Sequence, residues 1–414
     1  MKVVRNFELF LVVPAHVTTA RSCCIFVLLM ALLPGSASAI DNGLARTPPM
    51  GWNSWYAFRC GVTERGVLAN AQALVDSGMA RRGYRYVNVD GCWEAPTRSR
   101  HGALRADPVT FPSGMAALGR AIHGLGLKFG IYTSAGPTIC LHPQPGSYRH
   151  YRQDFRTFAR WKVDYVKVDW CSAPPDGDAT RAYRAIARAA RGAGRKMIVA
   201  VSTPGFRYPW RWAPDHGNLW RIADDANGSW AGVMSALDAD APLWPYAAPG
   251  RWNDPDILQV GAPALTPVEE RAHFSLWSML AAPLLAGYDL PSLSDASIAA
   301  MSNREVIAVD QDPAGCQGRR VGVRDGVETW VRPLAGGSWA VLLLNRRARV
   351  QRVSVRADRI PGLPPTSRYW VRDLWEHSSR PVRARQAIDV ELAGHEAAMW
   401  RIRPVGGYAL HEWG

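Results

Sequence analysis

The feature that most constrains the fold of this 414-residue chain is an alternation of strand-like and helix-like segments between about residues 44 and 310. Eight short apolar or β-branched runs have the character of buried strands, and helical patterns separate them. The strand-like runs are Met50–Trp55, Tyr84–Asp90, Lys128–Thr133, Asp164–Asp169, Met197–Thr203, Leu219–Asp225, Arg251–Val260 and Pro283–Asp289. The helical patterns are Arg65–Arg81, Met115–Gly124, Arg149–Trp161, Ala179–Ala193 and Pro267–Leu280. This alternation predicts an α/β fold of the TIM (β/α)8 barrel type.

A doubly wound open sheet is the competing α/β fold. Its nucleotide-binding form needs a G-x-G-x-x-G turn that opens a helix directly after a strand. The nearest pattern here, Gly124-Leu125-Gly126, ends a helix and precedes a strand. The barrel is therefore the better prediction.

The pattern changes after about Asp312. Short alternating runs separated by Gly, Pro, Asp and Asn-Arg turns replace the helical period, as in an antiparallel β-sandwich. They are Val321–Val323, Glu328–Val331, Ser338–Leu344, Val350–Val355 and Ala398–Ile402. We predict a catalytic barrel over residues 40–312 and a C-terminal antiparallel β-sandwich domain over residues 313–414.

The first 39 residues have the pattern of a secretory signal peptide. Arg21 precedes an apolar run from Cys24 to Leu33, and Ala37-Ser38-Ala39 is a small-x-small cleavage site. The apolar run is too short to span a membrane. We expect a mature chain that starts near Ile40 and is exported to the medium or to a periplasm, where disulfides form.

Composition argues against several other classes of function. The formal net charge is +14, but the basic residues include only five Lys and are spread along the chain, so a nucleic-acid stripe is not expected. No C-x₂-C or H-x-x-x-H spacing occurs, and we predict neither a metal site nor a cofactor. The 18 Trp favour a carbohydrate partner, because indole rings form the usual walls of sugar sites.

The stretch Asp164–Cys171 carries the strongest chemical signal. With a strand period of two, Tyr165, Lys167 and Asp169 share one face, which puts an ammonium beside a carboxylate at the strand's carboxyl end. Chemistry in a parallel barrel is done at that end, and an Asp held beside a Lys stays ionised and can act as a nucleophile. A buried structural ion pair is the alternative interpretation.

Polar and aromatic side chains also follow the other predicted strands. They are Asn53-Ser54-Trp55, Asp90, Tyr132, Arg221 with Asp224-Asp225, and Asp254 with Asp256. Taken singly, Trp55 and Tyr132 could cap the core, and Asp254 and Asp256 could belong to a turn. Together, two separated carboxylates with Arg, Lys and aromatic walls form the arrangement that hydrolyses glycosidic bonds.

These motifs resemble those of glycoside hydrolase family 27, the melibiase-type α-galactosidases and α-N-acetylgalactosaminidases. The matching pieces run in order from about residue 44 to the sandwich. They are Thr47–Trp55, Gly83–Asp90, Gly130-Ile131-Tyr132, Asp164–Cys171, Trp220-Arg221 followed by Asp225, Trp252–Asp256 and Val309–Pro313.

The resemblance implies roles for individual residues. Asp169 matches the nucleophile, and Asp225 matches the general acid/base, with Asp224 as the rival for that second role. The positions matching the sugar subsite are Trp55, Asp90, Tyr132, Lys167, Arg221 and Asp256. The implied disulfides join Cys60 to Cys92 and Cys140 to Cys171, which leaves Cys316 unpaired.

The activity implied is that of a secreted retaining exo-glycosidase that hydrolyses terminal α-galactosidic bonds of an oligosaccharide or polysaccharide by double displacement. The two carboxyl groups are then expected roughly 5–5.5 Å apart. A catalytically inactive sugar-binding protein is the alternative outside enzymes. The oligomeric state is left open.

Two departures from the family pattern bear on the sugar. Gly91 stands where a second Asp usually holds the C4 and C6 hydroxyls, so it weakens galactose recognition and is expected to open space for a pentose or for a sugar substituted at C6. Ser202-Thr203-Pro204-Gly205 replaces the loop that selects the 2-substituent. β-L-arabinopyranosidase and isomaltose-releasing dextranase activities of the same family are therefore alternatives.

Overall fold

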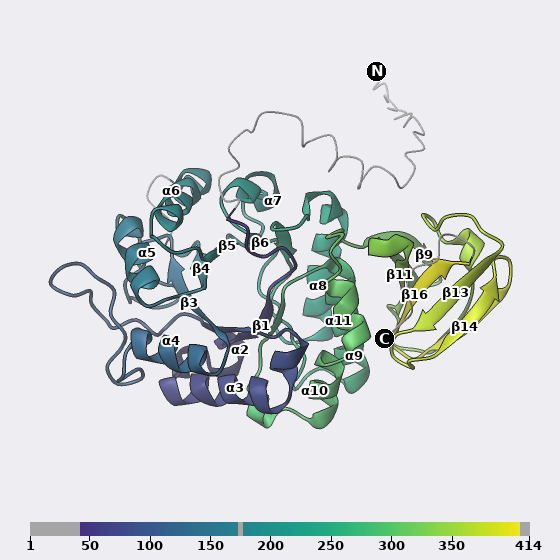
Figure 1. Ribbon diagram of the computed structural model, residues 1–414, viewed down its shortest axis with the longest axis horizontal. Helices are drawn as coiled ribbons and strands as arrows, with labels where there is room; N and C mark the ends of the chain where they lie inside the picture. Colours follow the sequence, from purple (N-terminus) through teal and green to yellow (C-terminus); the bar gives the residue numbers. More distant parts are fainter. Residues whose placement is uncertain (1–41, 173–176, 406–414) are drawn as a thin grey trace, which may run out of the picture. The chain divides into compact units, whose positions relative to one another are not determined.

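The computed structural model describes residues 42–172 and 177–405 (Figure 1). The predicted signal peptide lies outside these described residues. Within them, no helix combines the length and the apolar character needed to cross a membrane.

Eight parallel strands form the first sheet, in the order β7-β6-β5-β4-β3-β2-β1-β8. They are β1 (Met50–Asn53), β2 (Tyr86–Val89), β3 (Lys128–Ser134), β4 (Tyr165–Asp169), β5 (Ile198–Ser202), β6 (Leu219–Arg221), β7 (Trp252–Asp254) and β8 (Leu284–Ala286). The sheet is curled, and a single parallel bridge between Leu258 and Ala286 links the segment after β7 to β8. Each strand lies within a predicted run except β3, which ends one residue beyond it, and the predicted barrel class is confirmed.

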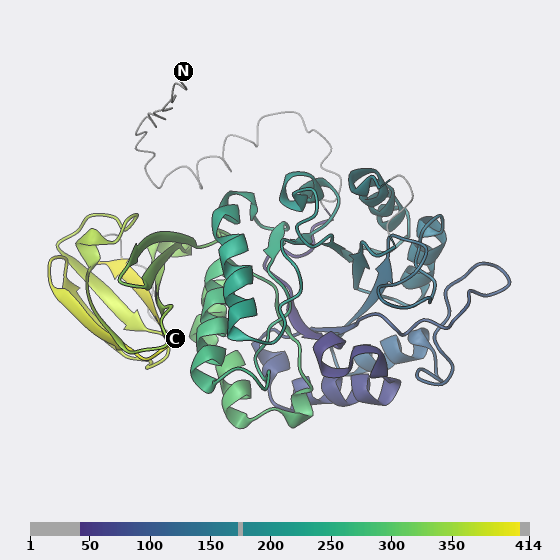
Figure 2. The ribbon, with the colours of Figure 1, turned by 180° about the vertical axis from the view of Figure 1, so that it is seen from behind.

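Helices lie around the outside of these strands (Figures 1 and 2). They are α2 (Trp55–Phe58), α3 (Glu64–Asp76), α4 (Met115–Gly124), α5 (Tyr151–Arg160), α6 (Ala179–Arg191), α7 (Pro209–Trp212), α8 (Trp230–Asp240), α9 (Pro267–Leu280), α10 (Asp295–Met301) and α11 (Arg304–Asp310). Helices α2, α7, α8, α10 and α11 were not predicted from the sequence. Helix α8 lacks a clear polar face, but Ser229 caps it by accepting a hydrogen bond from the Gly232 backbone N–H at 3.1 Å.

The C-terminal strands are all antiparallel, which confirms the predicted sandwich. They are β9 (Arg319–Arg324), β10 (Val327–Pro333), β11 (Trp339–Asn345), β12 (Gln351–Arg356), β13 (Arg368–Asp373), β14 (Ser379–Arg383), β15 (Ala387–Leu392) and β16 (Ala397–Pro404). A six-stranded sheet has the order β14-β13-β16-β11-β10-β9, and β12 pairs with β15 in a second sheet. Strands β13 to β15 were missed by the sequence analysis.

Strand β11 is buried along its whole length because both of its faces are covered. Val341 and Leu343 belong to the core of the sandwich. Leu342 and Leu344, on the opposite face, belong to the hydrophobic cluster that also contains the barrel helices. The six-stranded sheet is therefore packed against the barrel on one side and closes the sandwich on the other.

Candidate active site

Parallel pairing brings the carboxyl ends of the barrel strands to one mouth, where the predicted site residues meet. Lys167 lies between two of these strand ends. Its ammonium forms a salt bridge at 3.0 Å with Asp90, which follows β2. Burial alone would lower the pKa of this ammonium, but negative charge on Asp90, Asp169 and Asp225 outweighs burial and raises the pKa.

This geometry corrects one detail of the sequence interpretation. We expected the ammonium of Lys167 to be the direct partner of Asp169, but its salt bridge goes to Asp90. Asp90 is buried and also accepts a hydrogen bond from the Asn53 side-chain amide at 2.9 Å. Lys167 nevertheless influences Asp169, because its positive charge opposes the rise in the pKa of that carboxyl group.

Asp169, the last residue of β4, is held by the end of the neighbouring strand β5. The Ser202 hydroxyl donates a 2.7 Å hydrogen bond to Asp169 Oδ1, and the sulfur of Cys140 lies 3.2 Å from Oδ2. Burial raises the pKa of this carboxyl above its usual value, while the Lys167 charge and the Ser202 hydrogen bond oppose the rise. The carboxylate is thus fixed in place at the mouth of the barrel.

Asp225 follows β6 and lies in a more open setting, with 57% of its side chain exposed. Arg221 Nη2 contacts Asp225 Oδ1 at 3.0 Å. Burial would raise the pKa of this carboxyl, but the charges of Arg221, Lys167 and Arg59 outweigh burial and lower it. The rival residue Asp224 is also exposed, and within the described residues it forms no salt bridge like that of Asp225 with Arg221.

Asp256 is the second carboxylate that the Arg221 guanidinium contacts. Its Oδ1 lies 3.1 Å from Arg221 Nη1, and its Oδ2 accepts hydrogen bonds from the Tyr56 hydroxyl at 2.6 Å and from the Ala226 backbone N–H at 2.8 Å. The residue is buried, and burial raises the pKa of its carboxyl. Arg221 therefore joins a buried carboxylate to an exposed one.

The comparisons with known proteins agree with this geometry. A family model described as alpha galactosidase A matches residues 47–312, and one described as alpha galactosidase C-terminal beta sandwich domain matches residues 298–402. The chain belongs to the melibiase family of glycoside hydrolases. The resemblance inferred from the sequence is thereby confirmed.

Individual members of the melibiase family match most of the chain. An α-galactosidase A of Cellvibrio japonicus is 43% identical over 77% of this chain and 80% of its own length. A rice α-galactosidase is 40% identical over 88% of this chain and 87% of its own. Among solved structures, α-galactosidase I of Mortierella vinacea has a TM-score of 0.84 at 30% identity and covers 88% of this chain and 99% of its own.

Two aromatic side chains predicted for the sugar subsite of this melibiase lie at the same mouth. Trp55 starts α2, and its backbone N–H donates to the Asn53 side chain at 2.8 Å. Tyr132 in β3 is buried, and the Lys167 ammonium lies 5.4 Å from the centre of its ring.

Gly91 does not open space as we expected. A Cβ at this position would lie 3.2 Å from Tyr132 Cε1, so the tyrosine ring already fills the volume beside the glycine. The expectation of extra room was wrong because the identity of residue 91 alone does not show which neighbouring side chain occupies the space beside it. Weakened galactose recognition stays a prediction, which rests on the absence of a carboxylate at position 91.

Both implied disulfides are present. Cys60 pairs with Cys92 and Cys140 with Cys171, with Cα–Cα distances of 5.1 and 5.0 Å. The second disulfide anchors the loop after β3 to the residue two places beyond Asp169. Because Cys140 also contacts Asp169, this disulfide restrains the carboxylate directly.

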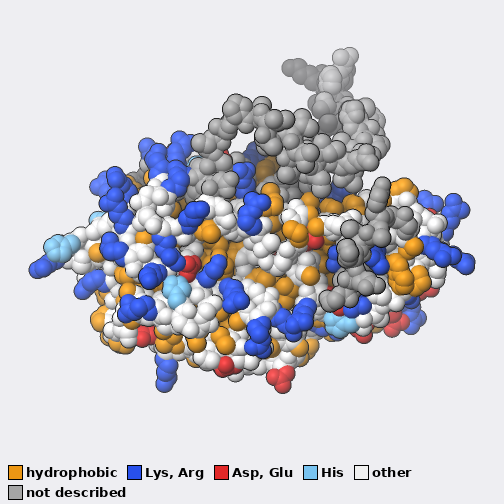
Figure 3. All heavy atoms as spheres, in the orientation of Figure 1, with side chains coloured by type: hydrophobic (Ala, Val, Ile, Leu, Met, Phe, Trp, Pro, Cys, Tyr) orange, Lys and Arg blue, Asp and Glu red, His pale blue; other side chains and the backbone are white. Residues whose placement is uncertain are grey.

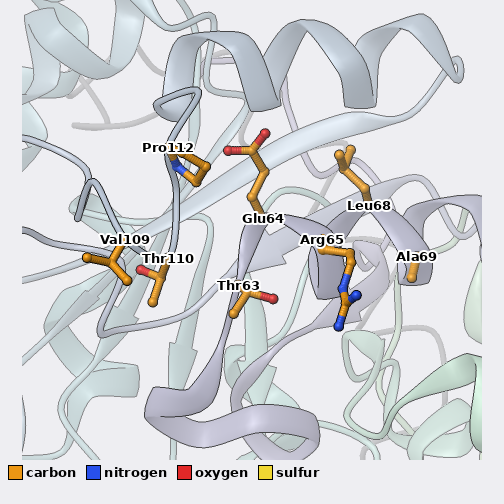
Figure 4. A pocket seen from close by; sticks show the side chains of 8 residues that line it. All are labelled: Thr63, Glu64, Arg65, Leu68, Ala69, Val109, Thr110 and Pro112. Atoms are coloured by element: carbon orange, nitrogen blue, oxygen red, sulfur yellow. The ribbon is translucent and has the colours of Figure 1, made fainter.

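Two hollows in the described residues differ from each other in chemistry. A cavity of about 20 Å³ inside the barrel is lined by both polar and apolar residues, the polar ones including Lys167, Arg221 and Asp256, and it has room for about one water molecule. A groove of about 680 Å³ lies on the surface between the start of α3 and residues 109–112 (Figure 4). This groove contains no predicted site residue, so size alone does not locate the chemistry.

Two residues that shape the site, Tyr56 and Arg59, were missed from the sequence, and a third, Ser202, was expected in a different role. Ser202 had been considered for the sugar's 2-position, and its bond to Asp169 depends on the pairing of β4 with β5, which places residue 202 opposite residue 169. Tyr56 reaches Asp256 across 200 residues of sequence. Only its place directly after the Asn53-Ser54-Trp55 strand end could have indicated it.

Proposed function

We propose that this melibiase is a secreted, retaining exo-α-galactosidase with Asp169 as nucleophile and Asp225 as general acid/base. The observation that carries the proposal is the contrast between these two carboxylates within one charged network. Asp169 is held by Ser202, while Asp225 is exposed and bound to Arg221. The names of the relatives described above support galactose as the sugar.

The mechanism follows from the two environments. Asp225 in its acid form donates its proton to the glycosidic oxygen as the bond to the leaving group breaks. Asp169 donates an electron pair to the anomeric carbon and forms a glycosyl ester. Water then attacks the same carbon, gives its proton to Asp225 and releases Asp169, so that two inversions retain the configuration.

The anomer formed first tests this mechanism. We expect hydrolysis of p-nitrophenyl α-D-galactopyranoside to release α-galactose before mutarotation, as followed by proton NMR. Release of β-galactose as the first product would contradict double displacement. That result would indicate inverting hydrolysis, in which the two carboxyl groups lie farther apart than the roughly 5–5.5 Å expected for a retaining enzyme.

β-L-arabinopyranoside hydrolysis is the second candidate, because position 91 offers no carboxylate to the C6 hydroxyl. The two substrates differ only by the CH₂OH group at C5, so the ratio of kcat/KM for their p-nitrophenyl glycosides measures recognition of that group. We expect the galactoside to be preferred. The Gly91→Asp variant tests the residue: Gly91 is not among the positive-φ glycines, and an added Cβ, 3.2 Å from the edge of the Tyr132 ring, requires a small shift of that ring.

Secretion and a carbohydrate partner belong to the same proposal. Two disulfides in the described residues support export, because such bonds persist in oxidising compartments. Expression of the full chain with N-terminal sequencing of the exported protein tests this point, and we expect the mature chain to start near Ile40. Activity confined to the cytosolic fraction would contradict it.

A further inference from the structure

Arg59 is an exposed cation at the rim of the active site. It directly follows α2, and its side chain folds back over that helix. The Arg59 guanidinium carbon lies 5.2 Å from the centre of the Trp55 ring and 5.0 Å from the centre of the Tyr56 ring. Stacking on two rings fixes the orientation of the guanidinium before any ligand arrives.

Tyr56 connects this stack to the general acid/base. Its hydroxyl donates to Asp256 at 2.6 Å and also to the backbone carbonyl of Ala226, the residue after Asp225. The charge of Arg59 is one of those that lower the pKa of the Asp225 carboxyl. Arg59 therefore lies close to Asp225 and outside the buried cluster of Asp90, Lys167 and Arg221.

The guanidinium has unused hydrogen-bonding capacity. Within residues 42–172 and 177–405 it forms no hydrogen bond and no salt bridge with a side chain, whereas the neighbouring Arg221 is bound to two carboxylates. An exposed, oriented guanidinium suits a planar or tetrahedral oxyanion, because its donors match such groups in pairs.

The charge of the whole protein points the same way. The chain has 49 Lys and Arg against 35 Asp and Glu, and basic side chains are abundant on the face drawn in Figure 3. A positive field concentrates anionic ligands near the surface and speeds their association. A polymer with repeated negative charges would gain most from it.

We propose that Arg59 is a specificity-determining residue of the leaving-group subsite, where it binds an anionic group on the sugar next to the bond that is cleaved. The inference rests on the proposed function, because Asp225 as proton donor defines the leaving-group side. The ligand class is a glycan whose penultimate sugar carries a carboxylate, as a uronic acid does, or a sulfate ester. The bond broken and the products formed are those of the proposed hydrolysis.

The test compares substrates that differ by one charge. They are α-D-galactosyl-(1→4)-D-galacturonic acid and its methyl ester, with α-D-galactosyl-(1→4)-D-galactose 6-sulfate and its unsulfated parent as a second pair. We expect the wild type to prefer the charged member of at least one pair by about fivefold or more in kcat/KM at low salt, and to lose much of that preference in 0.5 M NaCl.

Variants assign the preference to Arg59. Arg59→Gln and Arg59→Met, the second of which keeps the apolar stem over the rings, should bring the charged-to-neutral ratio close to one, and Arg59→Lys should keep part of it. Arg324→Gln is the matched control: it removes one charge from a side chain that is 90% exposed in the sandwich domain, and the ratio should stay at the wild-type value. Melting temperatures confirm that each variant is folded.

The outcomes separate the two proposals. Turnover of p-nitrophenyl α-D-galactopyranoside that is lost in Asp169→Asn establishes the proposed function, and its absence in the wild type overturns both proposals. With that turnover present, a ratio of one in the wild type, or an unchanged ratio in Arg59→Gln, overturns the role of Arg59 alone. The pair with the larger ratio identifies the anion as a carboxylate or a sulfate.

Discussion

The ends of β4 and β6 hold the two carboxylates of the site in opposite ways. Asp169 belongs to its strand, accepts a hydrogen bond from Ser202 on the next strand and touches a disulfide sulfur. Asp225 lies on a loop four residues beyond Arg221, is 57% exposed and has that arginine as its ion-pair partner. Burial dominates at the first residue and positive charge at the second, so the pKa of Asp169 is raised and that of Asp225 is lowered.

Rigidity and access are therefore divided between the two acids. The proposed nucleophile, Asp169, must keep its geometry through two displacement steps, and strand β4 with its disulfide supplies that rigidity. The proposed proton donor, Asp225, must meet leaving groups of different shape, and the loop after β6 leaves it open. Substrate binding would exclude water from Asp225 and raise its pKa toward the value that an acid needs.

The largest expected effect is that of Asp169→Asn. Without a nucleophile no glycosyl ester can form, so kcat for p-nitrophenyl α-D-galactopyranoside should fall by about 10⁴ or more. Residual turnover within tenfold of the wild type would break the assignment. Far-ultraviolet circular dichroism of the variant checks that it is folded.

Asp225→Asn should cost less, and the cost should depend on the leaving group. General acid catalysis contributes about 10² to 10⁴ in rate, and a nitrophenolate leaves with little help from a proton. We therefore expect a small loss with the nitrophenyl galactoside and a large loss with an unactivated disaccharide, measured as kcat/KM. Equal losses with both substrates would contradict the acid role. Asp224→Asn is the matched control.

Arg221→Met tests the residue that links the buried carboxylate to the exposed one. Removal of the guanidinium leaves Asp256 charged and buried, which should lower the free energy of unfolding by about 3–5 kcal/mol, as measured by urea denaturation. Arg221→Lys should lose less, because it keeps the charge. A midpoint unchanged in Arg221→Met would mean that Asp256 is protonated in the folded protein.

Ser202→Ala should remove the hydrogen bond that orients Asp169, the proposed nucleophile. This hydrogen bond lowers the pKa of Asp169, so its loss raises that pKa. Because the nucleophile must be ionised, the acidic limb of the pH profile of kcat, which reports the substrate complex, should move to higher pH, with a loss of roughly tenfold at the optimum. Ser202→Thr keeps a hydroxyl and serves as the control. An unmoved acidic limb would show that the bond does not tune Asp169.

The smallest effect is expected from Arg59→Gln on a neutral substrate. The Arg59 charge helps to lower the pKa of Asp225, so its removal raises that pKa. Since the acid must be protonated, the basic limb of the pH profile of kcat, which reports the substrate complex, should move to higher pH, by about 0.1–0.7 units for a solvent-screened charge. A shift to lower pH would contradict the sign of the interaction.

Much of the fold could be predicted from local pattern. The eight barrel strands are marked by apolar runs, and helices α4 and α9 end where the periodicity ends. The helix α8 was missed because it has apolar residues on most sides, and β13 to β15 were missed because charged and polar residues interrupt them. The resemblance to one family then supplied the candidate residues at the strand ends.

The pairing within the site was beyond the reach of the sequence. Lys167 is two residues from Asp169, yet its salt bridge goes to Asp90, 77 positions away. The volume left by Gly91 is filled by Tyr132 from the next strand. The spacing of residues along the chain predicts neither contact, because both depend on how far each strand end extends into the mouth of the barrel.

The sequence by itself determined the layer order of the barrel and sandwich and the set of charged side chains delivered to one edge, because strand period and apolar runs are local properties. Only the tertiary structure shows which charges neutralise each other, which carboxylate is buried, and that Arg59 stacks on two rings without forming a salt bridge within the described residues. Those outcomes depend on distances between strands that are remote in sequence, and on the dielectric that the packed neighbours create around each charge.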